Sequence, residues 1–256
     1  MICAGVDAGS RAIKVALIDA GDMTVVGSGM DNQGVDQEAL SRAVFERALA
    51  TSGVPANQVD KVVATGYGRN RVSFADTTIT EITCHACGVR HVVPDAMTII
   101  EVGGQDSKLI RLDGKGSVRD FSMNDRCAAG TGRFLEVVAS RLGVGLETLG
   151  ALAAQSRNPA SISSTCVVFA ETEIVGLLAS GIASEDIVAG VQSSIARRVV
   201  AMLGRNVQTP VVFTGGVALV PGMREAMERA IEKPVQVAPD PQMTGALGAA
   251  ILASRL

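Results

Sequence analysis

The chain contains one short pattern twice, and this duplication limits its possible folds more than any other feature. The first copy covers residues 2–19 and the second covers residues 98–113. Each copy is an apolar strand, a tight turn of glycine with acidic or amide residues, and a second strand of alternating polarity. A polar turn and a third strand follow, over Met23–Gly27 and Ser117–Ser122. A repeated β-hairpin unit predicts two similar lobes facing each other.

Helical patterns fill the intervals between the strands, which indicates an α/β protein. Asp36 is expected to cap a helix that extends to Ser52, and Ser184 followed by two acids predicts the start of a helix over residues 184–204. Further helices are predicted over 131–142, 145–155, 168–180, 222–232 and 243–255, and strands over 61–64 and 210–214. We expect a first lobe of residues 1–95 plus 244–256, and a second lobe of residues 96–243.

Composition excludes several classes of protein. Apolar residues make up 47% of the chain and charged residues 19%, which is incompatible with disorder. A net charge of −3, no Trp and one Tyr argue against nucleic acid as a partner. No apolar run reaches the length of a membrane span, and the N-terminus lacks the basic region of a signal peptide. We therefore expect a cytoplasmic protein, in which the five cysteines stay reduced.

Glycine turns follow three predicted strands, and together they suit a nucleotide. In Asp7-Ala8-Gly9-Ser10, glycine allows close approach of a phosphate, the Ser10 hydroxyl can donate to it, and Asp7 can hold Mg²⁺ through water. Gly103-Gly104-Gln105-Asp106 is the matching turn of the second copy. Thr214-Gly215-Gly216-Val217 offers a flat backbone surface for an adenosine. No Walker sequence or dinucleotide-binding glycine motif follows the first strand.

This order of motifs resembles the superfamily of acetate and sugar kinases, heat-shock 70 chaperones and actin. The resemblance implies two ribonuclease-H-like lobes that close on ATP in the cleft between them. It assigns Asp7 to Ser10 to the first phosphate motif, Gly103 to Asp106 to the second, and Gly215 with Gly216 to the adenosine motif. Gln105 or Asp106 could orient the attacking water, and the sequence does not decide between them.

Two cysteines lie in loops of small residues just before predicted helices. Cys127 is in Asn124–Phe134 and Cys166 is in Ser163–Glu171. A helix N-terminus favours thiolates and anionic groups. An all-cysteine [4Fe–4S] cluster needs four thiolates, which two chains about a two-fold axis could supply. The alternative is that both thiols are buried small hydrophobes.

Other motifs are ambiguous. Cys84-His85-Ala86-Cys87 has the spacing of a zinc or redox site, but no second pair follows, so a structural or incidental role is favoured. Cys3 is expected in the core. The segment Thr65–Asn70 follows a strand and either lines the cleft or is a plain loop.

The whole chain resembles the activator components of 2-hydroxyacyl-CoA dehydratases, in the BadF/BadG/BcrA/BcrD-type ATPase family, which also includes the ATPase subunits of benzoyl-CoA reductase. The segments that carry the resemblance are Gly5–Ser10, Ala64–Arg69, Gly103–Asp106, Asn124–Gly132, Ser163–Glu171, Thr214–Val217 and Gly245–Ala250.

The resemblance implies an oxygen-sensitive homodimer with one bridging [4Fe–4S] cluster, whose ligands map onto Cys127 and Cys166 of each chain. It also implies ATP and Mg²⁺ in each protomer, a ferredoxin or flavodoxin as electron donor, and an iron–sulfur dehydratase or reductase as acceptor. We expect ATP to close the lobes, to move the helices that follow the two cysteines, and to drive one-electron transfer.

Two other functions remain open from the sequence. A small-molecule kinase of the same fold would phosphorylate a sugar or an acid, with Asp106 as base. An ATP-gated scaffold would bind nucleotide but no iron. The sequence does not identify the acceptor of the electron.

Overall fold

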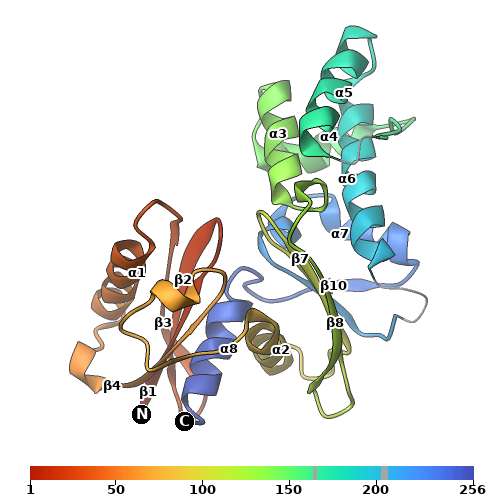
Figure 1. Cartoon of the computed structure of the whole chain (residues 1–256). Helices are drawn as coiled ribbons and strands as arrows, with labels where there is room; N and C mark the ends of the chain where they lie inside the picture. The colour runs from red at the N-terminus through yellow and green to blue at the C-terminus, as the bar shows by residue number, and fades with distance from the viewer. Residues whose placement is uncertain (164–165, 203–206) are drawn as a thin grey trace. The chain divides into compact units, whose positions relative to one another are not determined.

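The computed structural model describes residues 1–163, 166–202 and 207–256. Ser164 and Thr165 of the second cysteine motif, and the end of the helix predicted over 184–204, lie outside the described residues. The chain divides into two compact units (Figure 1). The first comprises Met1–Ala96, Leu112–Arg119 and Ala238–Leu256, and the second comprises Met97–Arg111 and Asp120–Val237.

A five-stranded sheet with the order β3-β2-β1-β4-β5 forms the centre of the first unit. β1 is antiparallel to β2 and parallel to β4. The elements are β1 (Ile2–Ala8), β2 (Ala12–Asp19), β3 (Thr24–Asn32), α1 (Gln37–Ser52), β4 (Val59–Thr65), β5 (Thr77–Thr78), α2 (Glu81–Val92) and α8 (Thr244–Ala253).

The second sheet repeats this topology strand for strand. Its order is β8-β7-β6-β9-β10, and β6 is antiparallel to β7 and parallel to β9. The predicted duplication is therefore confirmed, as is the α/β class. The elements are β6 (Thr98–Val102), β7 (Ser107–Leu112), β8 (Val118–Asn124), α3 (Gly132–Leu142), α4 (Leu149–Gln155), α5 (Val167–Ala179), α6 (Ser184–Ala201), β9 (Val211–Thr214), α7 (Met223–Ile231) and β10 (Val235–Val237).

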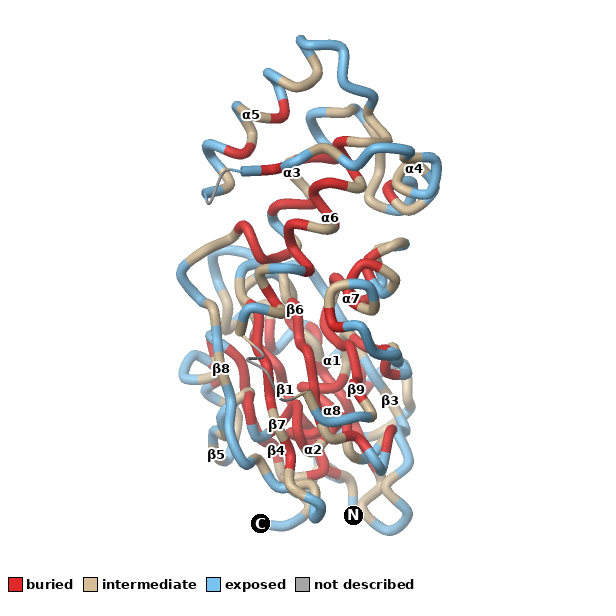
Figure 2. Tube along the Cα trace, turned by 90° about the vertical axis from the view of Figure 1, so that its right-hand side faces the viewer, coloured by how far each residue is buried: buried red, intermediate tan, exposed pale blue. Residues whose placement is uncertain are grey.

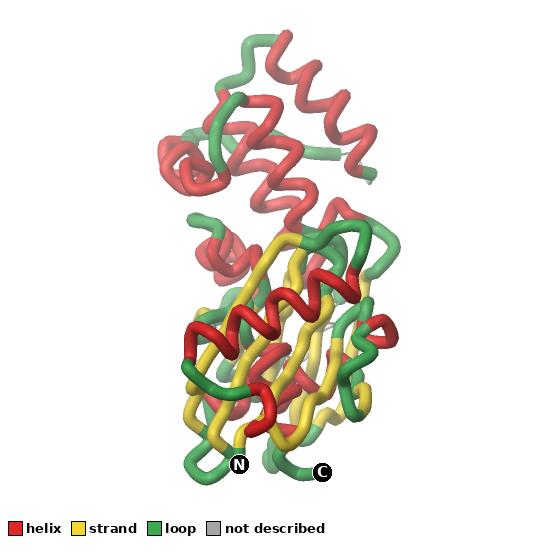
Figure 3. Tube along the Cα trace, turned by 90° about the vertical axis from the view of Figure 1, so that its left-hand side faces the viewer, coloured by secondary structure: helices red, strands yellow, loops and turns green. Residues whose placement is uncertain are grey.

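Helices cover both faces of the first sheet. Side chains alternate between the faces of a strand, so Val6 and its neighbours on one side of β1 pack with Val44 and Ala48 of α1. Figure 3 shows α1 lying across the strands. Cys3, on the opposite side of β1, packs with Cys84 of α2 and Ala246 of α8. This arrangement positions the end of β1 beside the start of α8.

Two predicted helix starts are confirmed, but only the first has a side-chain cap. The Asp36 carboxylate accepts a hydrogen bond from the Ala39 N–H and caps α1, as predicted. α6 begins at Ser184, but its N-cap residue is Ala183, which makes no side-chain cap. The Asp186 carboxylate instead accepts bonds from the Ser156 hydroxyl and the N–H groups of Arg157 and Asn158, because that loop passes close to the helix.

We expect Gly248→Ala to destabilise the first unit, because a Cβ at this position of α8 would overlap the carbonyl oxygen of Cys84 in α2. Overpacking of this kind costs about 1–3 kcal/mol. Thermal unfolding would measure the loss. Gly114→Ala is the control, since its Cβ would meet no atom within 4 Å. Equal melting temperatures for both variants would contradict the close packing of α2 on α8.

Candidate functional site

The first glycine turn is held by the residues on either side of it. Asp7, at the end of β1, is buried, and its carboxylate lies 3.2 Å from the Lys14 ammonium on β2. The Gly9 N–H donates to the Ala12 carbonyl at 3.1 Å and closes the turn. The Gly68 N–H donates to the Ala8 carbonyl at 2.8 Å, so the segment Thr65–Asn70 lies against the turn rather than apart from it.

The second turn has the same construction with more buried charge. The Gly103 N–H donates to the Asp106 carbonyl at 2.9 Å. The Lys108 ammonium, only 2% exposed, lies 2.8 Å from the Glu101 carboxylate and 2.7 Å from that of Asp106. A buried charge requires compensation of this kind, because desolvation is otherwise costly. Lys108 therefore fixes the Asp106 side chain beside the turn.

The two turns are equivalent in register. Asp7 is directly paired with Lys14 across one hairpin, and Glu101 with Lys108 across the other. The structural counterpart of Asp7 is therefore Glu101, which lies before the second turn. No role was predicted from the sequence for Lys14, Glu101 or Lys108. Their equal spacing could have indicated the pairs, because in both copies the lysine follows the acid by seven positions.

The third turn lies beside the second, in the same unit. Thr214 ends β9 and is paired with Glu101 of the parallel strand β6, so both turns leave the same edge of the sheet. Gly215 has a φ of 87°, and a Cβ there would lie 2.7 Å from a Glu101 carboxylate oxygen. Only glycine fits this position. Thr214 and Val217 are buried, while Gly216 begins a 3₁₀ turn, Gly216–Leu219.

The two candidate cluster ligands both precede helical segments. Cys127 is half-buried and lies before the 3₁₀ turn Ala128–Gly130, with α3 starting shortly after it. The side chain of Asn124 donates to the Cys127 carbonyl at 2.8 Å and accepts from its N–H at 3.1 Å. Cys166 is exposed and directly precedes α5. Neither is in a disulfide.

Comparison with known proteins identifies the relatives of this chain. Residues 4–253 match the model of the BadF/BadG/BcrA/BcrD ATPase family. The chain belongs to this family. It is 44% identical over 254 residues to a 2-hydroxyisocaproyl-CoA dehydratase activator of Clostridioides difficile, which covers 99% of this chain and 95% of the relative. The predicted family resemblance is confirmed.

Solved structures with the same fold identify the fold class of this chain. An activator of the 2-hydroxyisocaproyl-CoA dehydratase from Clostridium difficile with bound ADPNP matches with a TM-score of 0.93 and 43% identity, over 100% of this chain and 95% of that one. A ROK family glucokinase from Streptomyces griseus, in complex with glucose and AMPPNP, matches with a TM-score of 0.63 over 100% of both chains. At 15% identity, the glucokinase shows the fold alone. The predicted kinase, heat-shock 70 and actin fold is confirmed.

The other three cysteines of this chain are in or near the core. Cys3 and Cys84 are fully buried, and burial raises the pKa of Cys84 to about 12. Burial also raises the pKa of Cys87, which is half-buried on the same helix. His85 is buried and bonded to the Thr244 hydroxyl at 3.0 Å. Within the described ranges, no three His, Cys, Asp or Glu side chains converge as a metal site.

α5, which follows Cys166, is apolar except for Glu171, Thr172 and Glu173, yet only Ala170 and Ile174 are buried. Figure 2 shows the helix largely exposed or half-buried. Val168 and Phe169 are 67% and 68% exposed. The apolar side chains of a helix are normally covered by protein, and this helix leaves Val168 and Phe169 uncovered near the exposed Cys166 thiol.

The segments of the chain that the structure describes include no single helix with both the length and the apolar character to cross a membrane. Gly132–Leu142 together with Leu146–Gln155 meets that criterion as a pair bent by 92°.

We expect Lys108→Met to lower the free energy of unfolding by about 3–5 kcal/mol, because it leaves the buried Glu101 carboxylate without its cation. Adding Glu101→Gln should recover part of the loss, since the uncompensated charge is then removed. Denaturant unfolding would measure both. Lys233→Met, at an exposed lysine, is the control. A Lys108→Met variant as stable as this control would contradict the buried ion pair.

Proposed function

We propose that this chain is an ATP-dependent activator whose homodimer holds one [4Fe–4S] cluster and passes single electrons to a 2-hydroxyacyl-CoA dehydratase or a related reductase. The observation that carries the proposal is the pair of thiols at helix starts, Cys127 and Cys166, in a chain with three turns suited to ATP. A relative named as a dehydratase activator supports it.

The two thiols are chemically suited to a shared cluster. They lie outside the buried core, neither is oxidised to a disulfide, and each precedes a helical segment, whose positive N-terminal end favours thiolate. When bound, a [4Fe–4S] cluster supplies a low-potential one-electron centre. Two thiolates per chain cannot hold it alone, so the proposal requires two chains, with Cys127 and Cys166 of each as ligands.

The exposed surface of α5 supports the homodimer. Burial of Val168 and Phe169 against a second copy would remove apolar surface from water at about 25 cal/mol per Å². The same contact would bring the Cys166 residues of two chains toward the two-fold axis, as C₂ symmetry requires of identical surfaces.

We propose that each glycine turn binds a different part of the nucleotide. Gly9 and Ser10 of the first turn and Gly103 and Gly104 of the second bind phosphates, and Asp7 holds Mg²⁺ through water. Thr214–Val217 binds the adenosine. Gln105 or Asp106 orients the attacking water, and the Lys108 ammonium holds the Asp106 carboxylate in position through a hydrogen bond of 2.7 Å.

A short path of hydrogen bonds supports coupling between the nucleotide and the cysteines. The N–H groups of Gly132 and Arg133, at the start of α3, donate to the carbonyls of Gly103 and Gly104, both at 2.9 Å. The Cys127 loop immediately precedes this helix. A shift of the second turn on ATP binding or hydrolysis would therefore move the start of α3 and the thiol before it.

We also propose that ATP binds in a cleft between a lobe of residues 1–95 plus 244–256 and a lobe of residues 96–243. The proposed setting is cytoplasmic and anaerobic, and the proposed electron donor is a ferredoxin or flavodoxin. Neither nucleic acid nor a membrane is proposed as a partner.

We expect anaerobic protein to contain four iron and four sulfide per two chains, since each chain supplies two of the four required thiolates. Cys127→Ser and Cys166→Ser should each abolish iron binding. Iron and sulfide analysis with native mass measurement would test this. Cys87→Ser is the matched control and should keep the cluster, because its thiol is half-buried on another helix. A monomeric, iron-free wild type saturated with ATP would refute the proposal.

ATP hydrolysis by the reduced dimer is expected to fall by about 10²-fold or more when the residue that orients water is removed, in Gln105→Ala or Asp106→Ala. Asp7→Asn should instead weaken binding of Mg²⁺-ATP. Phosphate release and nucleotide titration separate the two effects. Asp95→Asn, at an exposed acid, should match the wild type. Transfer of phosphate to a sugar or acid, in place of phosphate release, would favour the kinase alternative.

A further inference from the structure

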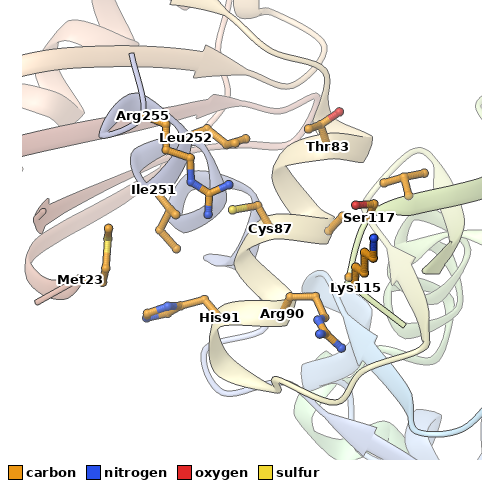
Figure 4. A pocket seen from close by; sticks show the side chains of 13 residues that line it. Met23, Thr83, Cys87, Arg90, His91, Lys115, Ser117, Ile251, Leu252 and Arg255 are labelled. Atoms are coloured by element: carbon orange, nitrogen blue, oxygen red, sulfur yellow. The ribbon is translucent and has the colours of Figure 1, made fainter. Parts of the chain in front are cut away.

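A cavity in the first unit lies outside all three glycine turns. It has a volume of about 520 Å³ and is lined by one side of α2, the last turn of α8, Met23 and the turn Lys115–Val118 (Figure 4). Every lining residue belongs to the first unit. Ligand sites in proteins span about 300–1,000 Å³, so this cavity has the size of a small-molecule site.

The charge of the lining is entirely positive. Arg90, Lys115 and Arg255 line the cavity with His91, and none of the described residues that line it is acidic. The whole chain carries a net charge of −3, so a cavity lined by cations is not explained by the overall charge of the chain. Asp113, two residues before Lys115, accepts hydrogen bonds at its carboxylate from the N–H groups of Lys115 and Ser117, which stabilise the turn.

The cations come from three different elements. Helix dipoles favour basic residues at helix C-termini, which accounts for Arg90 and His91 at the end of α2 and for Arg255 after α8. That effect does not account for Lys115, which is on a hairpin turn. Lys115 and Arg255 are exposed, so solvent screens part of their mutual repulsion, and an anion between them would remove the rest.

The floor of the cavity is apolar and contains a thiol. Ala86, Ile251 and Leu252 line it beside Cys87. Burial raises the pKa of the Cys87 thiol, and the positive charge of Arg255 partly offsets this rise. The effect of Arg255 indicates that the two side chains are close. Figure 4 shows the Arg255 guanidinium beside Cys87. An apolar floor with a few convergent polar groups is typical of a ligand site.

We propose that this cavity is a binding site for a small-molecule polyanion carrying phosphate or carboxylate groups, held by Arg255 and Lys115. The site is separate from the Asp7 turn. That turn lies near the opposite end of α8, where a Cβ at Gly245 would be 3.0 Å from the Asp7 carboxylate. The ten residues of α8 span about 15 Å. Because the helix joins the two places, the site is suited to an effector of the nucleotide turn.

The test is isothermal titration of the cluster-containing protein, under anaerobic, magnesium-free conditions and with saturating ADP. The probes are inorganic pyrophosphate and citrate, which separate a phosphate ligand from a carboxylate ligand. We expect one of them to bind at one site per chain. Arg255→Gln and Lys115→Gln should each weaken binding at least tenfold, and Arg157→Gln, at an exposed arginine of the second unit, should bind as the wild type does.

A second readout reports on the cavity itself. The bound probe should slow alkylation of Cys87 by N-ethylmaleimide, measured by peptide mass spectrometry, in the wild type but not in Arg255→Gln. The proposal is overturned if neither probe binds saturably, if binding disappears when ADP is present, or if Arg255→Gln and Arg157→Gln bind equally. Because ADP binding is measured separately, failure of the proposed nucleotide site would be distinguishable from failure of this one.

Discussion

The carboxylate–lysine pair that crosses each hairpin is the interaction on which the candidate site depends. Asp7 with Lys14, and Glu101 with Lys108, lie where a strand ends and a glycine turn begins. Buried charges are tolerated only when they are paired, so each pair fixes the direction in which its turn leaves the sheet. In the second hairpin, Lys108 also bonds Asp106, and the charge network thereby extends into the turn itself.

The second turn is connected to two other parts of its unit. It accepts hydrogen bonds from the start of α3, and it lies beside Gly215 of the third turn, where Glu101 leaves no room for a side chain. The Cys127 loop is fixed by Asn124 on one side and leads into α3 on the other. Within the second unit, the second glycine turn, the third turn and the Cys127 loop are therefore joined by hydrogen bonds and close contacts.

Much of the fold could be predicted because its signals are local. The duplicated hairpins, the Asp36 cap of α1 and the glycine turns each depend on residues close together in sequence. The short strands β5 and β10 were not predicted, because two or three residues carry no recognisable period. The start of α6 at Ser184 was predicted correctly, but the bonds from the Asp186 carboxylate to the loop of Ser156 and Asn158 were not, because local patterns contain no such distant partner.

The sequence by itself determined the family, the α/β fold, the three turns and the two thiols that precede helical segments, because each is written in consecutive residues. Only the tertiary structure decided that Glu101 is the counterpart of Asp7, that Cys84 is buried in the core, and that cations from three elements converge on one cavity. The physical reason is that pairing, burial and electrostatic convergence depend on distances between residues far apart in the chain.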